Sequence, residues 1–399
     1  MLELSENIGK ISPDPVRSWI KTLKDLGAVN MFTIGEPDPI SKDVLEVYAK
    51  AEYESNVSSR TSYPPVAGEE NLIKNIIRME TGFNTKLTEE DASRIYVTIG
   101  ASQALQFIFS VFKTGSEILV MTPCWGTIHN MIQHSGNVGV PVKFFENGKF
   151  LEENAKKALT KKTQAAYINF PSNPACEIMP EKAVREFGNF CASHGLQIIT
   201  DEPYKYLIYD SGRTPYYSPA NMDSDVSSRV SVTSSFSKII KPDIRLGYVR
   251  VSPTIIEADK NKRLVYYFRN LSAGASRGVQ AGVNAVLEKD IKLEFLRPVV
   301  KNYREKAELL ERYFAQMGCQ LPSKPAAAYM MFPKTPNNEN GEEFVKRIAG
   351  EYKTAFLPGT SFGGGFKGFE ENAKNFRVGF GGGQTRQKID EVFAAIMRK

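Results

Sequence analysis

The stretch Leu196-Gln197-Ile198-Ile199-Thr200-Asp201-Glu202-Pro203-Tyr204 decides the fold class, because a short apolar run ends there in charged and polar residues. The run has the length and the β-branched residues of a buried strand. Comparable runs recur along the chain, at residues 94–99, 117–121, 165–170, 230–233 and 247–251. Stretches with the apolar spacing of a helix separate them, as at residues 102–112 and 180–194. This alternation predicts an α/β fold with a mostly parallel central sheet and flanking helices.

The pattern changes towards the end of the chain. A long helical stretch is expected at residues 290–317, and beyond it the elements shorten while Gly and Pro become more frequent. We therefore expect a large domain from residues 45–288 and a smaller α+β domain from residues 1–44 and 289–399. The length of 399 residues fits this division into folding units of ordinary size.

Composition and charge exclude several classes of protein. Hydrophobic residues make up 42% and charged residues 24% of the chain, unlike disordered or collagen-like proteins. A net charge of +6 is too dilute to indicate nucleic acid binding. The chain shows no apolar run as long as a membrane span and no signal-peptide pattern, so we expect a cytoplasmic protein without a membrane partner. The four cysteines and three histidines lack ligand spacing, so we expect no metal site.

Polar or glycine residues follow each apolar run, and we expect five of these strand ends to meet. They carry the clusters at residues 100–103, 123–125, 173–174, 201–204 and 235–238. In an open α/β sheet, ligands bind beyond the carboxyl ends of the strands. The sequence therefore predicts one crevice that all five clusters line.

Two charged residues in these clusters suit chemistry on an aromatic cofactor. Lys238 ends a strand near Arg245, so burial and the second cation would favour its neutral amine, as Schiff-base chemistry requires. Asp201 could keep a ring nitrogen protonated, and Tyr204 could donate to a phenolate oxygen. Taken alone, Lys238 would far more often be a solvated surface lysine, and Asp201 could equally be a helix N-cap.

A phosphate site is expected beside Lys238. Residues 98–103 join a strand to a helix, where free backbone N–H groups and the hydroxyl of Ser102 attract an anion. The Arg245 guanidinium would hold phosphate oxygens at the same place. Trp125 could stack on a flat ring, and Asn173 could bind a ring oxygen. An ordinary turn, a core tryptophan and a turn asparagine are the alternatives for these features taken singly.

With these motifs in this order, the sequence resembles the class I/II aminotransferases, which are fold-type I pyridoxal-phosphate enzymes, over nearly its full length. The resemblance implies pyridoxal 5′-phosphate as the cofactor, with Lys238 as the Schiff-base lysine and Asp201 at the pyridinium nitrogen. Together with Tyr204, these two are the implied catalytic residues. The implied contacts of the cofactor are Ala101, Ser102, Ser235 and Arg245 to the phosphate, Trp125 to the ring, and Asn173 and Tyr204 to its O3′ oxygen.

Three further segments extend the resemblance to the substrate and to a second subunit. Ile34-Gly35-Glu36-Pro37-Asp38 is similar to the family's N-terminal loop, whose glycine lies against the substrate. Arg377, in a C-terminal motif at residues 375–380, matches the arginine that binds the substrate α-carboxylate. Tyr63 matches a tyrosine that reaches the cofactor phosphate of the neighbouring subunit, which implies a homodimer with active sites at the subunit interface. The implied substrate-binding residues are Gly35, Trp125, Asn173 and Arg377.

The implied reaction moves an amino group from an L-amino acid to a 2-oxo acid, with 2-oxoglutarate as the expected acceptor and an aspartate/aromatic-type or broad donor specificity. In this reaction Lys238 moves the Cα proton. A lyase or synthase on the same fold is the alternative, because fold does not fix function. An acyl-serine enzyme is disfavoured, because the K-T-G at residues 113–115 precedes the S-x-x-K at residues 235–238.

Some positions depart from the family pattern. Asn173-Pro174-Ala175-Cys176 stands where Asn-Pro-Thr-Gly is usual, and Ala327-Ala328 replaces a glycine pair, which we expect to narrow the substrate side of the site. Ser102 stands where one aspartate-specific subgroup has a lysine for the distal carboxylate, so Arg277 is the candidate for that role. The G-x-G-x-x-G string at residues 363–368 lacks the context of a dinucleotide site and is expected to be a loop near the active-site mouth. The donor amino acid stays open.

Overall fold

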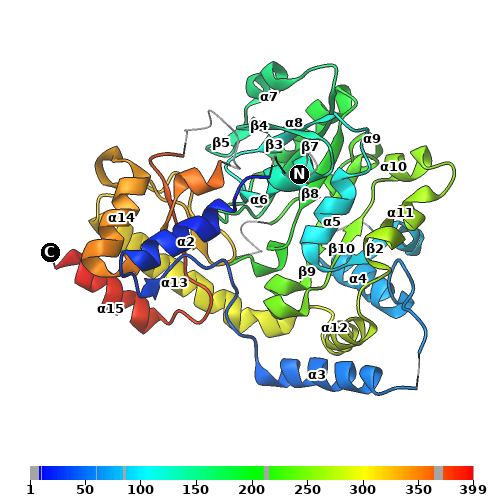
Figure 1. Ribbon diagram of the computed structural model, residues 1–399, viewed down its shortest axis with the longest axis horizontal. Coiled ribbons are helices and arrows are strands. Elements are labelled where there is room, and N and C mark those ends of the chain that lie inside the picture. Colours follow the sequence, from blue (N-terminus) through cyan, green and yellow to red (C-terminus); the bar gives the residue numbers. More distant parts are fainter. Residues whose placement is uncertain are drawn as a thin grey trace, which may run out of the picture.

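The computed structural model describes residues 9, 11–59, 61–83, 87–210, 215–363 and 372–398 (Figure 1). Its main feature is a seven-stranded sheet with the strand order β2-β10-β9-β8-β7-β3-β4. The strands are β2 (Ile95–Thr98), β3 (Glu117–Met121), β4 (Val138–Val142), β7 (Thr163–Asn169), β8 (Gln197–Asp201), β9 (Val230–Ser235) and β10 (Gly247–Arg250). Neighbours from β9 through β8, β7 and β3 to β4 are parallel, whereas β10 runs antiparallel to both β2 and β9. The predicted α/β fold with a mostly parallel sheet is confirmed.

Six of the seven strands lie where the sequence predicts strands, and β4 is the one that it misses. Its sequence, Val138-Gly139-Val140-Pro141-Val142, contains a glycine and a proline, which weaken a strand pattern. The strand pairs only with β3, at the edge of the sheet. A proline is tolerated there because an edge strand does not need every backbone N–H for pairing.

Helices cover both faces of this sheet because side chains alternate along each strand. On one face, Leu119 and Ile198 belong to an apolar cluster that includes residues of α8 (Glu181–Ser193). On the other face, their neighbours Ile118 and Ile199 belong to a cluster that includes residues of α5 (Gly100–Phe109) and α6 (Thr127–His134). The remaining helices of this region are α3 (Lys42–Asn56), α4 (Glu70–Gly82), α7 (Glu152–Ala158), α9 (Ser224–Ser227), α10 (Pro253–Ala258), α11 (Arg263–Ser272) and α12 (Arg277–Lys289).

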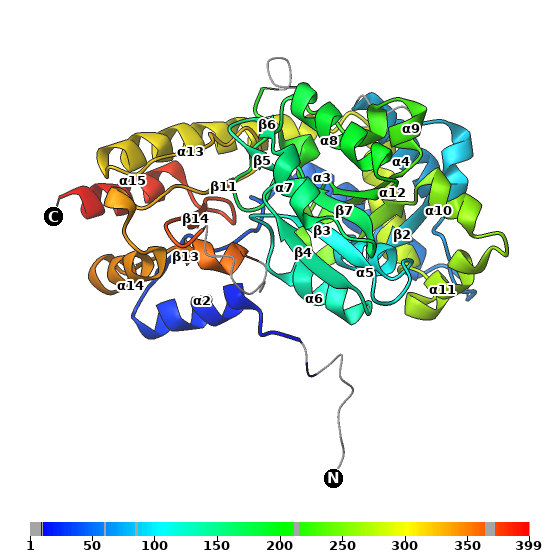
Figure 2. The ribbon, with the colours of Figure 1, turned by 90° about the horizontal axis from the view of Figure 1, so that it is seen from above.

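A second region joins both ends of the chain, as the blue and the orange to red segments of Figure 2 show. It contains a three-stranded sheet in the order β11-β14-β13 and the parallel pair β1-β12, whose strands lie more than 300 residues apart in sequence. The strands are β1 (Asn30–Met31), β11 (Met330–Met331), β12 (Thr354–Ala355), β13 (Leu357–Pro358) and β14 (Phe376–Gly379). The helices are α2 (Pro15–Asp25), α13 (Arg297–Gln316), α14 (Gly341–Tyr352) and α15 (Arg386–Met397). The domain boundaries at residues 45 and 288 stay a prediction.

The long helix of this region begins later than the sequence analysis expects. Residue 290 caps the end of α12, Leu293 has a left-handed φ of 55°, and a 3₁₀ turn at Glu294–Leu296 precedes α13. A proline occupies the first turn of α13, where no backbone N–H is needed. The prediction of a continuous helix from residue 290 is therefore wrong, because apolar spacing alone does not detect a break of this kind.

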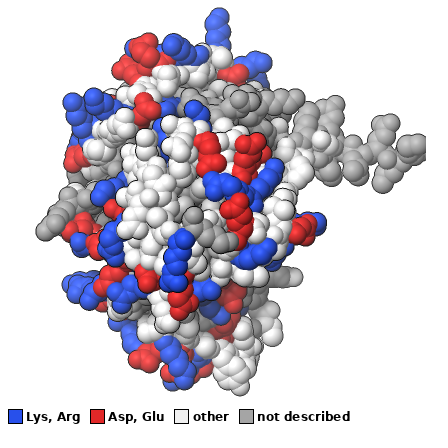
Figure 3. Space-filling model, turned by 90° about the vertical axis from the view of Figure 1, so that its left-hand side faces the viewer, with Lys and Arg blue, Asp and Glu red and all other residues white. Residues whose placement is uncertain are grey.

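Two general properties bear on partners. None of the helices among the described residues is both long enough and apolar enough to cross a membrane. On the face that Figure 3 shows, Lys and Arg side chains are interspersed with Asp and Glu side chains. This face therefore lacks the single-sign field that attracts nucleic acid.

Candidate active site

One cavity of about 620 Å³ lies at the carboxyl ends of the parallel strands, and we call it the strand-end cavity. The strand ends of the large sheet and the segments that follow them supply one part of its lining, which includes Ala101, Ser102, Trp125, Asn169, Asn173, Asp201, Tyr204, Ser235, Ser237, Lys238 and Arg245. The N-terminal segment and β14 supply another part, which includes Thr33, Ile34, Gly35, Glu36 and Arg377. Of the site residues that the sequence predicts, Tyr63 and Arg277 do not line this cavity.

Asp201 is the last residue of β8 and lies between two partner strands. In the register of the sheet it pairs with Asn169 of β7 and Thr233 of β9. Its carboxylate accepts hydrogen bonds from Thr233 Oγ1 at 2.8 Å and from the Tyr167 hydroxyl at 3.3 Å. Burial raises the pKa of Asp201 to about 7, while the two hydroxyls and the nearby Lys238 charge act in the opposite direction. The carboxyl is thus held in one orientation, and its protonation responds to any charged group that binds beside it in the cavity.

Lys238 ends the 3₁₀ turn Phe236–Lys238, directly after β9. The hydroxyl of Ser235 caps this turn by accepting a hydrogen bond from the backbone N–H of Ser237. Lys238 Nζ donates to the carbonyl oxygen of Gly35 at 3.0 Å and lies 5.7 Å from the centre of the Tyr204 ring. Burial, and then the charges of two arginines in the cavity, lower the pKa of Lys238 to about 8. Near neutral pH this amine is therefore unprotonated far more often than an exposed lysine.

An anion-binding cradle adjoins Lys238 where α5 begins. A Cβ added to Gly100 would lie 2.6 Å from a guanidinium nitrogen of Arg245, so this arginine packs directly on the first turn of α5. Gly100 also has a φ of 69°, which glycine adopts without strain. Arg245 Nη1 donates to Ser237 Oγ at 3.0 Å. The helix N-terminus, the guanidinium and the serine hydroxyls of the lining therefore meet at one end of the strand-end cavity.

Arg377 is a buried cation that extends from β14 into the cavity. Its Nη1 donates to Asn173 Oδ1 at 3.0 Å, and its Nη2 donates to the carbonyl oxygen of Thr33 at 2.6 Å. Among the described residues, the buried Nε has no hydrogen-bond partner. Burial lowers the pKa of Arg377 to about 10, so the side chain stays charged at neutral pH. A fixed guanidinium with a spare donor suits a carboxylate.

The family model for aminotransferases of class I and II matches residues 29–396 of the chain. The chain belongs to this family. It is 26% identical over 373 residues to an aspartate aminotransferase of Pyrococcus abyssi and 23% identical over 373 residues to an aromatic-amino-acid aminotransferase of Thermococcus litoralis, with 92% of each chain covered in both cases. Among solved structures, the aromatic aminotransferase from Pyrococcus horikoshii aligns with a TM-score of 0.83 at 25% identity over 99% of this chain and 98% of that one. A Thermus thermophilus aspartate aminotransferase variant aligns over both whole chains, with a TM-score of 0.85 at 21% identity.

Membership of this family implies pyridoxal 5′-phosphate as the cofactor, and the residues that line the strand-end cavity fit such a group. One end holds a buried amine and a carboxyl, which suit an aldehyde and a ring nitrogen. The other end holds the cradle of Arg245 and the first turn of α5, which suits a phosphate. The Arg377 guanidinium also lines the cavity and offers a cation for a carboxylate beside them.

Some residues singled out by the sequence lie outside this aminotransferase site. Tyr63 is 87% exposed, and the expectation that it reaches a neighbouring subunit stays a prediction. Arg277 pairs with Glu69 at 2.8 Å and donates to the carbonyls of Ser62 and Tyr63, so within this chain it holds the loop that carries Tyr63. Of the G-x-G-x-x-G string, residues 364–368 lie outside the described part of the chain.

The two alanines that replace a glycine pair do not line the cavity. Both are fully buried, and Ala328 has a left-handed φ of 52°. The next residue, Tyr329, donates its hydroxyl to the carbonyl oxygen of Gly35 at 3.2 Å. Among the described residues, these alanines therefore do not narrow the cavity directly. They are connected to the site through the neighbouring Tyr329.

Several residues of the site were not predicted. Asn169 and Tyr167 lie in β7, two residues apart and so on one face, and both hydrogen bond to Asp201. The signal was a polar residue and a tyrosine in an otherwise apolar run, next to a strand that ends in a carboxylate. The other missed lining residues include Thr33, Glu36 and one face of α2, formed by Val16, Arg17, Ile20 and Lys24. Their helical spacing was visible, but nothing local indicated which surface they cover.

Proposed function

We propose that this aminotransferase binds pyridoxal 5′-phosphate in the strand-end cavity on Lys238 and moves an amino group from an L-amino acid to a 2-oxo acid. The observation that carries the proposal is that the half-buried Lys238 amine lines one cavity together with the Asp201 carboxyl and the Arg377 guanidinium. Bound pyridoxal 5′-phosphate supplies an aldehyde that condenses with amines and a ring that takes up the electrons released when the Cα–H bond breaks.

The cavity residues divide the task of holding the cofactor. Asp201 would keep the ring nitrogen protonated, since a cation beside its buried carboxyl favours the charged pair. Ala101, Ser102, Ser235 and Arg245 would bind the phosphate, and Trp125 would lie on the ring. Tyr204 and Asn173 would hydrogen bond to the ring oxygen.

Lys238 and Arg377 would carry out the steps at the substrate. Arg377 binds the α-carboxylate, and this fixes Cα in the same cavity as the amine of Lys238. The neutral amine then removes the Cα proton and returns it on the cofactor side, for which a pKa near the working pH is suitable. Gly35 would line the substrate's place from the N-terminal segment. A reaction that keeps the carboxylate uses all these contacts, which favours cleavage of the Cα–H bond over decarboxylation. The named aminotransferase relatives favour transamination over the lyase alternative.

We also propose a homodimer, with Tyr63 reaching the phosphate site of the second copy. Exposed apolar side chains support this partner, because a second copy would remove them from water. They lie in α3, in the loop after it and in α11, and comprise Tyr53, Val57, Tyr63, Tyr266, Tyr267 and Leu271. Light scattering at micromolar concentration should give twice the chain mass, and a fully active monomer would contradict the proposal. A cytoplasmic location stays a prediction.

The proposed function is tested by the visible spectrum of the purified protein. A protein with bound cofactor should be coloured, and borohydride reduction should attach the cofactor to the peptide that contains Lys238. A panel of amino donors with 2-oxoglutarate then identifies the donor, starting with aspartate and aromatic amino acids because the named relatives act on these. A colourless protein with no labelled lysine would refute the cofactor. A coloured protein that no donor changes would favour the lyase alternative.

A further inference from the structure

Residues 33–38, which we call the roof segment, touch both charged groups that the proposed function uses. The carbonyl oxygen of Gly35 accepts the hydrogen bond of Lys238, and the carbonyl oxygen of Thr33 accepts one from Arg377. A Cβ added to Gly35 would lie 3.8 Å from the Arg377 guanidinium. The position of this backbone therefore decides where the amine and the guanidinium lie relative to each other.

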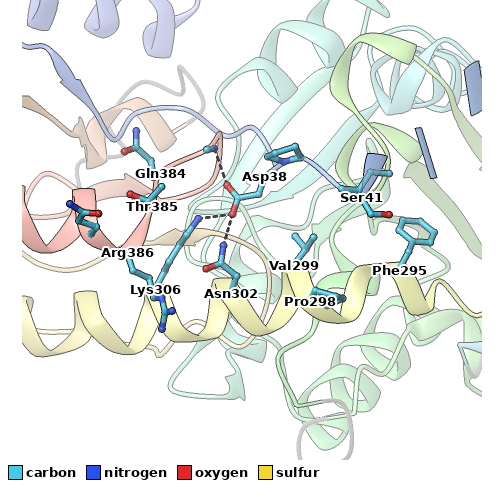
Figure 4. Close-up of a pocket in the computed structure, with 14 residues that line it drawn as sticks. Asp38, Ser41, Phe295, Pro298, Val299, Asn302, Lys306, Gln384, Thr385 and Arg386 are labelled. Carbon is cyan, nitrogen blue, oxygen red and sulfur yellow. Dashed lines mark hydrogen bonds and ion pairs between the residues drawn. The ribbon is translucent and has the colours of Figure 1, made fainter. Parts of the chain in front are cut away.

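The roof segment is anchored at its end by Asp38, as Figure 4 shows. The Asp38 carboxylate accepts hydrogen bonds from Lys306 Nζ at 2.5 Å, from Asn302 Nδ2 at 3.1 Å and from the backbone N–H of Gly383 at 2.9 Å. The ion pair is buried, since the side chains of Lys306 and Asp38 are 1% and 7% exposed. The backbone N–H of Asp38 donates to the Tyr303 hydroxyl. Three of these partners belong to α13 and one to the turn before α15.

The ion pair holds the end of the roof segment, while Gly379 and Gly381 pack against the backbone of Ile34 and Glu36. A cavity of about 730 Å³ lies beside Asp38, lined also by residues of α13 and of the turn before α15. Close packing therefore does not hold Asp38 from that direction. Lys306 also donates to the carbonyl oxygen of Phe380, close to β14, so the same amine connects the roof segment to the strand that carries Arg377.

We propose that Asp38 and Lys306 are positioning residues that fix the roof segment, and through its carbonyls set the placement of Lys238 and Arg377 for substrate binding. The inference rests on the proposed function, because it assigns the pair an effect on the substrate of that same site. Neither side chain lines the strand-end cavity, so the pair acts through Gly35 and Thr33. The phosphate cradle lies on the large sheet, and its affinity for the cofactor should not depend on the pair.

The first test compares Lys306→Met with Lys301→Met, an exposed lysine on the same helix. Loss of the Lys306 amine leaves the buried Asp38 without its cation, so the roof segment should shift. Because a misplacement of about 1 Å in such a site costs about 100-fold, we expect kcat/KM to fall by about 10- to 100-fold, mainly through KM. Cofactor affinity should stay within about twofold. Lys306→Arg, which keeps the charge, should recover most of the loss, and Lys301→Met should behave as the unchanged protein.

The second test does not need activity. In Lys306→Met, hydrogen exchange of the Gly383 and Asp38 amides should be about tenfold faster or more, because both are bonded within this anchor. If Lys306→Met does not fold, Asn302→Ala removes one donor and keeps the ion pair, and should give the same changes at a few-fold size. Unchanged exchange, or faster exchange with unchanged KM, would overturn the proposal. A wild-type protein that converts no amino acid would overturn the proposed function and leave the exchange prediction standing.

Discussion

The floor and the roof of the strand-end cavity are both held by buried charges, but in different ways. The floor network comprises Lys205, which follows Asp201 by four residues, and two carboxylates. The amine of Lys205 contacts Glu80 of α4 at 2.5 Å and Glu202 at 3.0 Å, and all three side chains are at most 3% exposed. The hydroxyls of Tyr206 and Tyr248 also donate to Glu80. The roof has one ion pair, Lys306 with Asp38, at one end of a single segment.

This difference separates stability from substrate binding. The floor network joins α4 to the loop after β8, so loss of the Lys205 amine would remove the ion-pair partner of two carboxylates that are buried beside the core of the large sheet. The ion pair of Lys306 and Asp38 joins the roof segment to α13 and lies beside the cavity of about 730 Å³. We therefore expect damage to the floor to appear as lost stability and damage to the roof to appear first as weaker substrate binding.

The largest effect is expected at Lys238, which lines the strand-end cavity and bonds to the roof segment. Lys238→Ala removes both the cofactor's attachment and the base, so turnover should fall by about 10⁴-fold, the upper range for loss of an acid–base group. Steady-state kinetics with the best donor measures this. Lys241→Ala, at a nearby exposed lysine, is the control and should keep its activity. A Lys238→Ala protein with unchanged kcat would refute Lys238 as the base.

The second-largest effect is expected from a variant that disrupts the floor network alone. Lys205→Met leaves Glu80 and Glu202 without their shared cation, and we expect the free energy of unfolding to drop by about 3–5 kcal/mol. Urea denaturation of the cofactor-free protein measures this. The matched control is Lys74→Met, which removes a solvent-exposed partner of Glu70 on the same helix α4 and should leave the urea midpoint unchanged. Equal midpoints for both variants would show that the floor network does not support the fold.

A third, smaller effect would show two charged residues of the strand-end cavity acting on one amine in opposite directions. Only the neutral Lys238 reacts with aldehydes, so reductive labelling of the cofactor-free protein should rise with pH around the pKa of about 8. The Asp201 charge raises this pKa and the Arg377 charge lowers it. Asp201→Asn should therefore move the midpoint to lower pH, and Arg377→Met should move it to higher pH. Mass spectrometry of the labelled peptides follows both, and a shift in the same direction for both variants would contradict the assignment.

The smallest effect is expected at Ala328, which precedes the Tyr329 that bonds to the roof segment. Its left-handed backbone would favour glycine by about 1–2 kcal/mol, but glycine costs more entropy on folding and loses a buried methyl group of about 0.8 kcal/mol. Ala328→Gly should therefore change the free energy of unfolding by less than about 1 kcal/mol. KM for small and large donors should stay the same, because Ala328 does not line the cavity. A KM change for large donors alone would restore the idea that the alanines narrow the site.

Many of the residues that the sequence placed correctly in the cavity share one property. Lys238, Asp201 and Ser102 each follow a short apolar run, and in a parallel sheet such strand ends converge. The contacts that the sequence did not predict join residues far apart in the chain. Lys306 and Asp38 are 268 residues apart, and Lys205 and Glu80 are 125 apart. No local pattern identifies such partners, because each member taken alone has the sequence surroundings of an ordinary surface charge.

The amino-acid sequence by itself determined six of the seven strands of the large sheet, the order of polar clusters at the strand ends and the family resemblance, because these depend on local apolar spacing and on motifs that are continuous in the chain. The tertiary structure alone decided which backbone covers Lys238, which carbonyls hold Arg377 and how strongly burial lowers the pKa of the lysine. These properties depend on distance and desolvation, which arise only when segments from both ends of the chain pack against the sheet.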